Sequence, residues 1–441
     1  MTSPKRVLHS PALRLRHFLA ALCTGGTAFA GVVSYDFNDN ALPFGSELRG
    51  TAAIANGEVV VTNNSSSQAG SFVLPDLDAG QYVTNFSSSF DLFIGNAGNP
   101  PADGLSFSFG QLPGGVFTEG GIDSDGNNFT LTSGLTISFD TYGGNDGTAG
   151  AGIGIEITYG QRRLYAIAAA NLPGATLDTN SYVPVSVNWN INTGLDVSYN
   201  GQTLVTGMKL VRSQSGNGAF PTGSRFGFGA RTGLFTEQHS VDNIQIGTDT
   251  QATAPTLNGR ISGTVATGTI VSAYNTSGTP NTPGNEGVTG AFDDSITTKY
   301  LNFNKSGAGA VVVPALPSGQ TGFLLDGFVL TAANDDVRRD PTSYTLEGSN
   351  DGSVWSSIST GSIPAFGDRY WSQEVDFQLT SQAFTQFRIA FPTLVDSVNG
   401  NSMQIGEIEL LGQAVPEPST VALAMLAAGA LPFLRRRRGA F

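Results

Sequence analysis

The feature that most constrains this chain is the absence of a sustained helical period between residues 31 and 413. Short runs that alternate apolar and polar residues take its place, and clusters of Gly, Asn, Asp and Ser separate them. Residues 58–62, 135–140 and 185–189 are examples. A two-residue period buries one face of a β-strand, and many short strands between turn signals are typical of sandwiches and jelly rolls. The sequence therefore predicts an all-β fold.

A polar segment without strand pattern, residues 247–258, divides the chain and contains Pro255. We expect a first domain over residues 31–249, a linker over 250–258 and a second domain over 259–413. Each domain is long enough to bury a hydrophobic core of its own. Two β-sandwich (jelly-roll) domains are therefore the predicted architecture.

Residues 1–30 have the parts of a secretory signal peptide. Four basic residues and no acid precede an apolar run over residues 17–23, and Ala28-Phe-Ala30 fits the small-residue cleavage rule. Cleavage after Ala30 would remove Cys23, the single cysteine of the chain. This excludes enzymes built on cysteine redox or cysteine–zinc chemistry, and we expect an exported protein.

The other end of the chain reads Val415-Pro-Glu-Pro-Ser419, then an apolar run over residues 420–434, then four arginines. An apolar run followed by a basic cluster is typical of a stop-transfer segment with its arginines in the cytoplasm. The three parts together resemble the PEP-CTERM sorting signal of Gram-negative bacteria. The resemblance implies a transmembrane sorting helix within residues 414–441, transient anchoring in the inner membrane, and processing by an exosortase-type enzyme near Pro416, Glu417 and Pro418. It also implies delivery to the cell surface or the extracellular matrix.

The charge of the predicted mature protein restricts its partners. Without the eight basic residues of the two ends and Glu417, 14 basic residues remain against 34 acidic ones. Such a surface repels nucleic acid, because phosphate binding needs a cationic face. It favours calcium, a hard cation that prefers oxygen ligands.

Two aspartates of the first domain, Asp103 and Asp140, lie at the ends of predicted strands beside glycine-rich loops. A carboxylate in such a place binds a metal or accepts hydrogen bonds from sugar hydroxyls, and Tyr142 could stack on a sugar face. An alternative is that both aspartates only cap turns. The segments that surround them are residues 86–94, 101–109, 135–145, 194–201, 225–233 and 239–246.

In this order the segments resemble the legume-type (L-type) lectins, which have the concanavalin A-like sandwich fold. The resemblance implies that Asp103 contacts sugar and that Asp140 binds calcium beside the carbonyl of Tyr142. The chain departs from the family pattern at Ser138, where the family has Glu, and no His follows in the loop, so we expect no transition-metal site. The residues that the resemblance assigns are Asp103, Tyr142 and Asn145 for carbohydrate and Asp140, Tyr142, Asn145 and Asp146 for calcium.

The second domain contains a predicted hairpin over residues 340–355, with Asp351 and Gly352 in its turn and Trp355 as a core anchor. Residues 387–391 and 403–411 give closing strands. This pattern resembles the discoidin (coagulation-factor type C) family, whose fold is the galactose-binding-like jelly roll. The resemblance implies a structural calcium between a loop and an acid of the last strand. The residues that it assigns are Asp293, Asp294, Thr298 and Glu407.

Neither domain carries a recognisable catalytic motif. Glycosidases need paired carboxylates, but Glu156 stands alone and Asp140 has no acid two residues before it. His239 is the single histidine of residues 31–413, and we expect it at the surface or in a turn near a strand start. No Gly-x-Ser-x-Gly segment accompanies it. The sequence predicts that the protein is not an enzyme, unless distant strands bring two acids into one groove.

These observations together predict an exported carbohydrate-binding protein of the cell surface or extracellular matrix, with calcium as its cofactor and an exopolysaccharide as its partner. The alternative is a structural or adhesive matrix protein without a specific sugar site. There the two sandwiches act as spacers, and the departures at Ser138 and Asn145 favour it.

Overall fold

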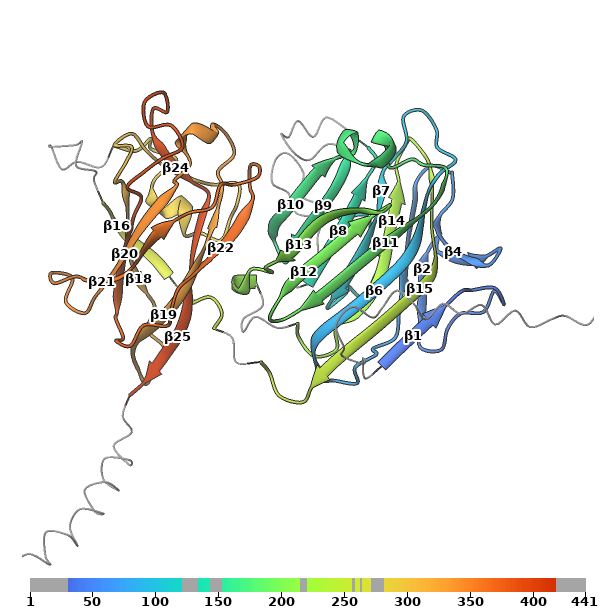
Figure 1. Ribbon diagram of the computed structural model, residues 1–441, viewed down its shortest axis with the longest axis horizontal. Helices are drawn as coiled ribbons and strands as arrows, with labels where there is room; N and C mark the ends of the chain where they lie inside the picture. The colour runs from blue at the N-terminus through green and yellow to red at the C-terminus, as the bar shows by residue number, and fades with distance from the viewer. Residues whose placement is uncertain are drawn as a thin grey trace, which may run out of the picture.

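The computed structural model describes residues 31–120, 134–142, 153–214, 220–255, 258–261, 264–270 and 281–417. These residues form two β-rich domains that lie side by side (Figure 1). Helical structure among them is confined to short 3₁₀ turns. The predicted all-β class is therefore confirmed.

The first domain consists of two antiparallel sheets. Its strands are β1 (Gly31–Tyr35), β2 (Glu47–Gly50), β3 (Ala53–Ala55), β4 (Glu58–Thr62), β5 (Gln68–Val73), β6 (Tyr82–Gly95), β7 (Gly104–Gly110), β8 (Gly134–Asp140), β9 (Gly154–Tyr159), β10 (Arg162–Ala168), β11 (Ser181–Asn190), β12 (Gly194–Tyr199), β13 (Gln202–Met208), β14 (Arg225–Thr232) and β15 (Gln238–Gln251). One sheet has the order β13-β12-β11-β6-β15-β4-β3, with β1 added to β15. The other has the order β10-β9-β8-β7-β14-β5-β2.

An aromatic core lies between these two sheets. Phe86, Phe90 and Leu92 alternate along β6 and are buried, while the residues between them are more exposed or smaller. Phe109 of β7 stacks on Phe226 of β14, with ring centroids 4.1 Å apart. Burying one such side chain contributes about 1.5–3 kcal/mol. The core therefore fixes the register of β7, β8 and β14. The register in turn decides which ends of these strands lie next to each other.

The second domain is smaller and has three sheets. Its strands are β16 (Thr264–Ile270), β17 (Tyr300–Asn302), β18 (Gly309–Pro314), β19 (Gln320–Thr331), β20 (Ser343–Ser349), β21 (Ser356–Ser362), β22 (Ser372–Asp376), β23 (Gln386–Ala390), β24 (Met403–Ile405) and β25 (Glu407–Pro416). The sheets have the orders β16-β18-β23-β20-β21, β22-β19-β25 and β17-β24. Phe328 of β19, Leu346 of β20 and Phe387 of β23 are fully buried in the core between them.

The predicted hairpin of the second domain is present, and its tryptophan is not where we expected it. β20 and β21 pair antiparallel around Gly352, whose φ of 72° suits glycine. Trp355 lies in the loop before β21, an edge strand, and is half-buried with the Arg388 guanidinium 4.6 Å from its ring centroid. Its predicted role as a core anchor is therefore wrong, because the residue lies in the connecting loop and its ring packs against Arg388.

The last described residues belong to the sheet of β25. Pro416 is the final residue of that strand, and the Glu417 N–H donates to the Gly319 carbonyl at 2.8 Å. Pro418, the apolar run after it and residues 1–30 lie outside the described residues. Within the described ranges no helix has the length and apolar character needed to cross a bilayer. The signal peptide and the sorting helix stay predictions.

Candidate functional site

The two aspartates singled out in the sequence meet where central strands of the seven-stranded sheet begin or end. We call this end of the sheet the strand edge. Asp103 directly precedes β7, and Asp140 is the last residue of β8. Antiparallel pairing places Gly104 opposite Asp140 on one side and opposite Arg231 of β14 on the other. Residues far apart in the sequence are therefore brought to neighbouring strand ends by the register alone.

Asp103 is held by its own backbone. Its N–H donates to the Arg231 carbonyl at 3.1 Å, and its carbonyl accepts from the Thr141 N–H at 3.0 Å. The Asp103 residue is 9% exposed, and burial raises the pKa of its carboxyl, an effect that nearby Arg231 partly opposes. A Cβ on Gly233 would lie 3.4 Å from Asp103 Oδ2, so the glycine keeps that side of the carboxylate approachable.

A guanidinium connects Asp103 to a second acid that the sequence did not reveal. Arg231 Nε lies 3.2 Å from Asp103 Oδ2 and 2.6 Å from Glu119 Oε1. Glu119 is buried, which raises the pKa of its carboxyl, and its Oε2 has no hydrogen-bond partner among the described residues. The Arg231 side chain is 47% exposed. We call Asp103, Glu119 and Arg231 the edge cluster.

A buried polar chain supports this edge from within the sandwich. Thr62 Oγ1 lies 2.6 Å from His239 Nδ1, and His239 Nε2 lies 2.8 Å from Glu237 Oε1. The Thr141 hydroxyl donates to the same oxygen of Glu237. Thr141 directly follows Asp140, so this series of hydrogen bonds holds the base of the turn after β8.

The position of His239 corrects the sequence-based expectation. We expected it at the surface or in a turn, but it is fully buried within β15, opposite Thr62 of β4. The strand begins one residue earlier, at Gln238, and directs His239 inward. Glu237 was not predicted at all. An acid two residues from a histidine was the available signal.

The predicted calcium ligands of the first domain are described only in part. Asp140 Oδ1 accepts the Tyr142 N–H at 2.9 Å, which is the turn-capping role of the alternative interpretation. The Tyr142 ring packs on Phe235, with centroids 5.7 Å apart. Asn145 and Asp146 lie outside the described residues. Calcium at this turn therefore stays a prediction.

A pocket of about 330 Å³ lies beside the turn. Pro101 and Thr141 connect it to the edge that carries Asp103 and Asp140, while Asp178 and alanines 168–170 form other walls. Its wall is mostly apolar with a few polar groups, which is the usual character of a small-molecule site. Pro101 and Thr141, near neighbours of Asp103 and Asp140 in the sequence, thus line a concave surface, while Asp103, Glu119 and Arg231 are not among its lining residues.

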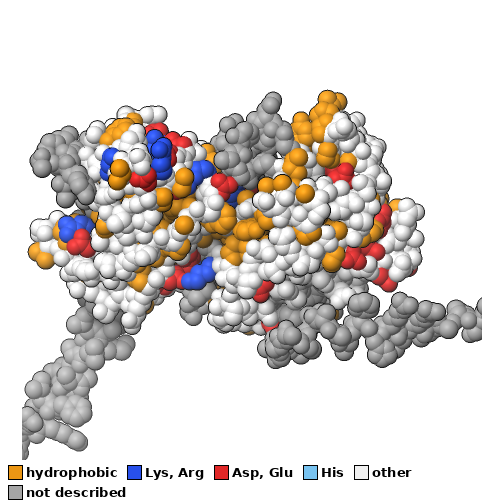
Figure 2. Space-filling model, turned by 45° about the horizontal axis from the view of Figure 1, so that its top comes forward, with side chains coloured by type: hydrophobic (Ala, Val, Ile, Leu, Met, Phe, Trp, Pro, Cys, Tyr) orange, Lys and Arg blue, Asp and Glu red, His pale blue; other side chains and the backbone are white. Residues whose placement is uncertain are grey.

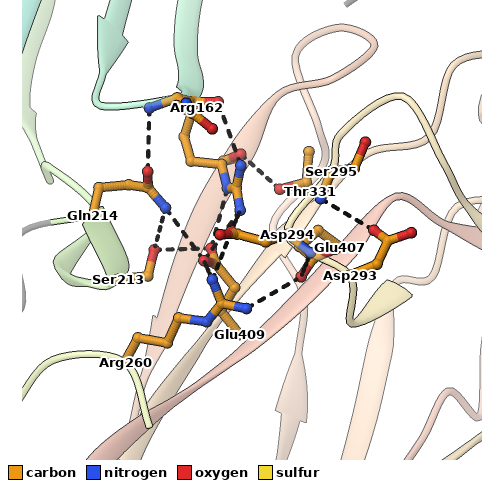
Figure 3. A network of polar contacts seen from close by, with 12 residues as sticks. Arg162, Ser213, Gln214, Arg260, Asp293, Asp294, Ser295, Thr331, Glu407 and Glu409 are labelled. Atoms are coloured by element: carbon orange, nitrogen blue, oxygen red, sulfur yellow. Dashed lines mark hydrogen bonds and ion pairs between the residues drawn. The ribbon is translucent and has the colours of Figure 1, made fainter. Parts of the chain in front are cut away.

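The second set of predicted ligands lies in a polar network between the two domains (Figure 3). Glu407 and Glu409 are two residues apart on β25, so their side chains share a face, and both are buried. The Asp294 N–H donates to Glu407 Oε1 at 3.2 Å. The Thr298 hydroxyl donates to Asp293 at 2.8 Å. The structure therefore brings the predicted loop to Glu407.

Two arginines, and not an arrangement of oxygens around one point, complete this network. Arg162 of the first domain places Nη2 2.8 Å from Asp294 Oδ1 and 3.2 Å from Glu409 Oε1. Arg260 Nη1 lies 2.6 Å from the same Asp294 oxygen and 3.2 Å from Glu409 Oε1. We call Arg162, Arg260, Asp294, Glu407 and Glu409 the interdomain cluster.

This arrangement does not fit the calcium that the discoidin resemblance implies. The predicted ligand Asp294 is paired with two guanidinium groups, and among the described residues no three Asp, Glu, His or Cys side chains are placed to hold a metal ion. Glu407 Oε2 is buried without a hydrogen-bond partner in the described part of the chain. Burial raises the pKa of Glu407 to about 8, and Arg162 partly offsets this.

Comparisons with known proteins add little to this geometry. No family model matches the chain. A segment of 89 residues is 34% identical to the peptide-N(4)-(N-acetyl-beta-glucosaminyl)asparagine amidase of Arabidopsis thaliana. The match covers 20% of this chain and 12% of that protein. The chain therefore spans about an eighth of this curated relative.

Solved structures similar to this chain include three lectin domains or lectins. The metal-free exoplasmic/lumenal domain of VIP36 is 17% identical, with 49% of this chain and 92% of that chain covered and a TM-score of 0.35. Lectin I-B4 from Griffonia simplicifolia is 15% identical, with coverages of 50% and 100% and a TM-score of 0.39. Lectin II from Ulex europaeus is 16% identical, with the same coverages and a TM-score of 0.38. Similarity at this level is too low to assign a ligand to this chain.

Proposed function

We propose that this protein binds carbohydrate at the strand edge that carries the edge cluster. One observation carries the proposal: the Asp103 carboxylate is held beside the half-exposed guanidinium of Arg231. A carboxylate accepts hydrogen bonds and a guanidinium donates them, so the pair matches both capacities of a sugar hydroxyl. Gly233 leaves the approach to Asp103 open.

Three further features support a sugar at this edge. The adjoining pocket is concave and has polar groups at Thr141 and Asp178. The Tyr142 and Phe235 rings offer an apolar surface against which a sugar face packs. The resemblance of the strand segments to L-type lectins assigns the same aspartate to sugar. Calcium at Asp140, Tyr142, Asn145 and Asp146 belongs to this proposal.

Export and surface delivery complete the proposed function. The predicted sorting motif begins at Pro416, the last residue of β25. Processing at the motif would therefore leave every described strand intact. This supports a protein that is held at the inner membrane for a time and then released to the cell surface or matrix by an exosortase-type enzyme.

We propose no catalytic activity, although two acids do approach each other. Asp103 and Glu119 both contact Arg231 Nε, so by the sum of the two distances their nearest oxygens lie within about 6 Å. A retaining glycosidase has carboxylates at about this separation. Here the guanidinium fills the space between them, where a glycosidic bond would have to lie.

A glycan array probed with the two-domain protein, with calcium and with a chelator, tests the proposal. We expect a signal that Asp103→Ala abolishes and that Asp39→Ala, at an exposed loop residue, leaves unchanged. Loss on chelation together with loss in Asp140→Ala would support calcium at the turn. A folded protein that is silent on all glycans would favour the structural matrix protein, which the turn-capping bond of Asp140 to Tyr142 also suits.

A further inference from the structure

Four basic side chains of the first domain contact the second domain. Residues 31–249 contain only seven Lys and Arg residues, so more than half of them gather at this one surface. Where the domains meet, acidic and basic side chains lie next to each other (Figure 2). The four are Arg162, Arg163, Lys209 and Arg212.

Arg212 shows how fully these contacts are built. Its Nε lies 2.8 Å from Glu374 Oε1, its Nη1 3.0 Å from Asp326 Oδ2, and its Nη2 2.9 Å from Asp376 Oδ1. All three acids belong to the second domain, two of them to β22 and one to β19. A guanidinium that pairs with three carboxylates neutralises charge and also orients the two domains relative to each other.

Arg162 is almost completely buried, and so is Arg163 beside it. The Arg162 side chain is 1% exposed, and it donates from both Nε and Nη2 to Glu409, which is 0% exposed. A buried guanidinium is tolerated only when it is paired in this way. Ser213, also of the first domain, donates to Glu409 at 2.8 Å. The acids of the second domain at this place are thus paired with a side chain of the first domain and with Arg260, which contacts the same Asp294 and Glu409 oxygens.

We propose that Arg162 and Arg260 are the resident cations of this acidic site, so that the docked protein binds no divalent metal at Glu407. The proposal does not depend on sugar binding. Calcium needs six to eight oxygen ligands, and the Asp294 and Glu409 oxygens already accept from guanidinium groups. A calcium ion would also lie beside the positive charges of the two guanidinium groups. Glu407 Oε2, buried and without a hydrogen-bond partner in the described residues, is the oxygen that a metal could use only after both arginines leave.

Calcium titration of the two-domain protein by calorimetry tests this, with small-angle X-ray scattering to report docking. We expect identical isotherms for the wild type and Glu407→Gln, because calcium at the Asp140 turn would appear in both. Arg162→Gln/Arg260→Gln should gain a calcium site that the wild type lacks, because no guanidinium then holds the Asp294 and Glu409 oxygens. The gain should disappear when Glu407→Gln is added to that variant, and scattering should show a more extended particle wherever Gln replaces Arg162.

Lys209→Gln is the matched control, because it removes an interface charge outside the cluster and should gain no site. A wild-type calcium site that Glu407→Gln abolishes while the scattering stays unchanged would overturn the proposal. A folded Arg162→Gln/Arg260→Gln that gains no site would also overturn it. If that variant does not fold, a calcium site that appears in Arg260→Gln, where Arg162 still holds these oxygens, would overturn the proposal, and Arg162→Lys/Arg260→Gln, which keeps one charge, should remain without the site.

Discussion

The edge cluster and the interdomain cluster use the same chemistry in different surroundings. In each, one guanidinium of the first domain lies between two acidic residues. Arg231 is 47% exposed and Arg162 is 1% exposed. Solvent competes with the first and not with the second, so the first can exchange its partner for a ligand while the second acts as a structural clamp. The exposure of the guanidinium, more than the types of residue around it, thus decides whether we expect a cluster to bind a ligand or to stabilise the fold.

The largest expected effect comes from breaking the clamp. Arg162→Ala removes one of the two guanidinium groups that pair with the buried Glu409, and breaking a buried ion pair costs up to about 3–5 kcal/mol. We expect the free energy of unfolding, measured with denaturant, to fall by about this amount. Lys209→Ala removes a more exposed pair with Asp376 at the same interface and should cost about 1 kcal/mol or less. Equal losses in the two variants would contradict the distinction.

The edge cluster, whose guanidinium is exposed, should respond more in binding than in stability. Asp103→Asn keeps the shape of the side chain but loses a charged acceptor, which is worth about 1.5–3 kcal/mol in a hydrogen bond. We expect the affinity for the glycan found on the array to fall about 10- to 100-fold. Calorimetry of the variant against that glycan measures this. Unchanged affinity would move the sugar away from Asp103.

The pH dependence of stability sharpens the contrast from the buried side. The folded protein holds the Glu407 proton up to about pH 8, while the unfolded chain releases it near 4.5. Between these values the folded state binds more protons, so the free energy of unfolding falls as pH rises, by up to about 1.4 kcal/mol per pH unit. Arg162, Arg260 and Glu409 face this carboxyl.

Glu407→Gln should remove this slope. Denaturant unfolding of both proteins from pH 5 to pH 8 gives the test, since all other titrating groups are shared. We expect the variant to gain stability over the wild type as pH rises. Parallel stability curves would show that Glu407 is ionised in the folded protein and that burial does not raise its pKa.

Local patterns in the sequence were sufficient for the strands and for the edge. The alternation over residues 86–94 lies within β6, and the run over residues 135–140 lies within β8. Asp103 and Asp140 meet because strand register places their neighbours opposite each other. A two-residue period contains this information, so the sequence predicts it.

The interdomain cluster could not be predicted in the same way. Arg162 and Glu409 are 247 residues apart, and no local period connects them. Two weaker signals were available. Adjacent arginines at 162 and 163 must point to opposite faces of a strand, and both prove buried. Acids at 407 and 409 share one face of a strand whose other residues are mostly apolar, and buried acids need cations.

The smallest expected effect tests whether Arg231 belongs to the proposed sugar site. Arg231→Gln keeps a donor but removes the charge, and an exposed charge contributes about 1 kcal/mol or less, which corresponds to a loss of affinity of roughly fivefold at most. Calorimetry with the same glycan measures it beside Asp103→Asn. A small loss would make Arg231 a supporting donor for a hydroxyl that Asp103 accepts. A gain in affinity would mean that the guanidinium competes with sugar for the carboxylate, and the edge cluster would then be a second clamp and not an open site.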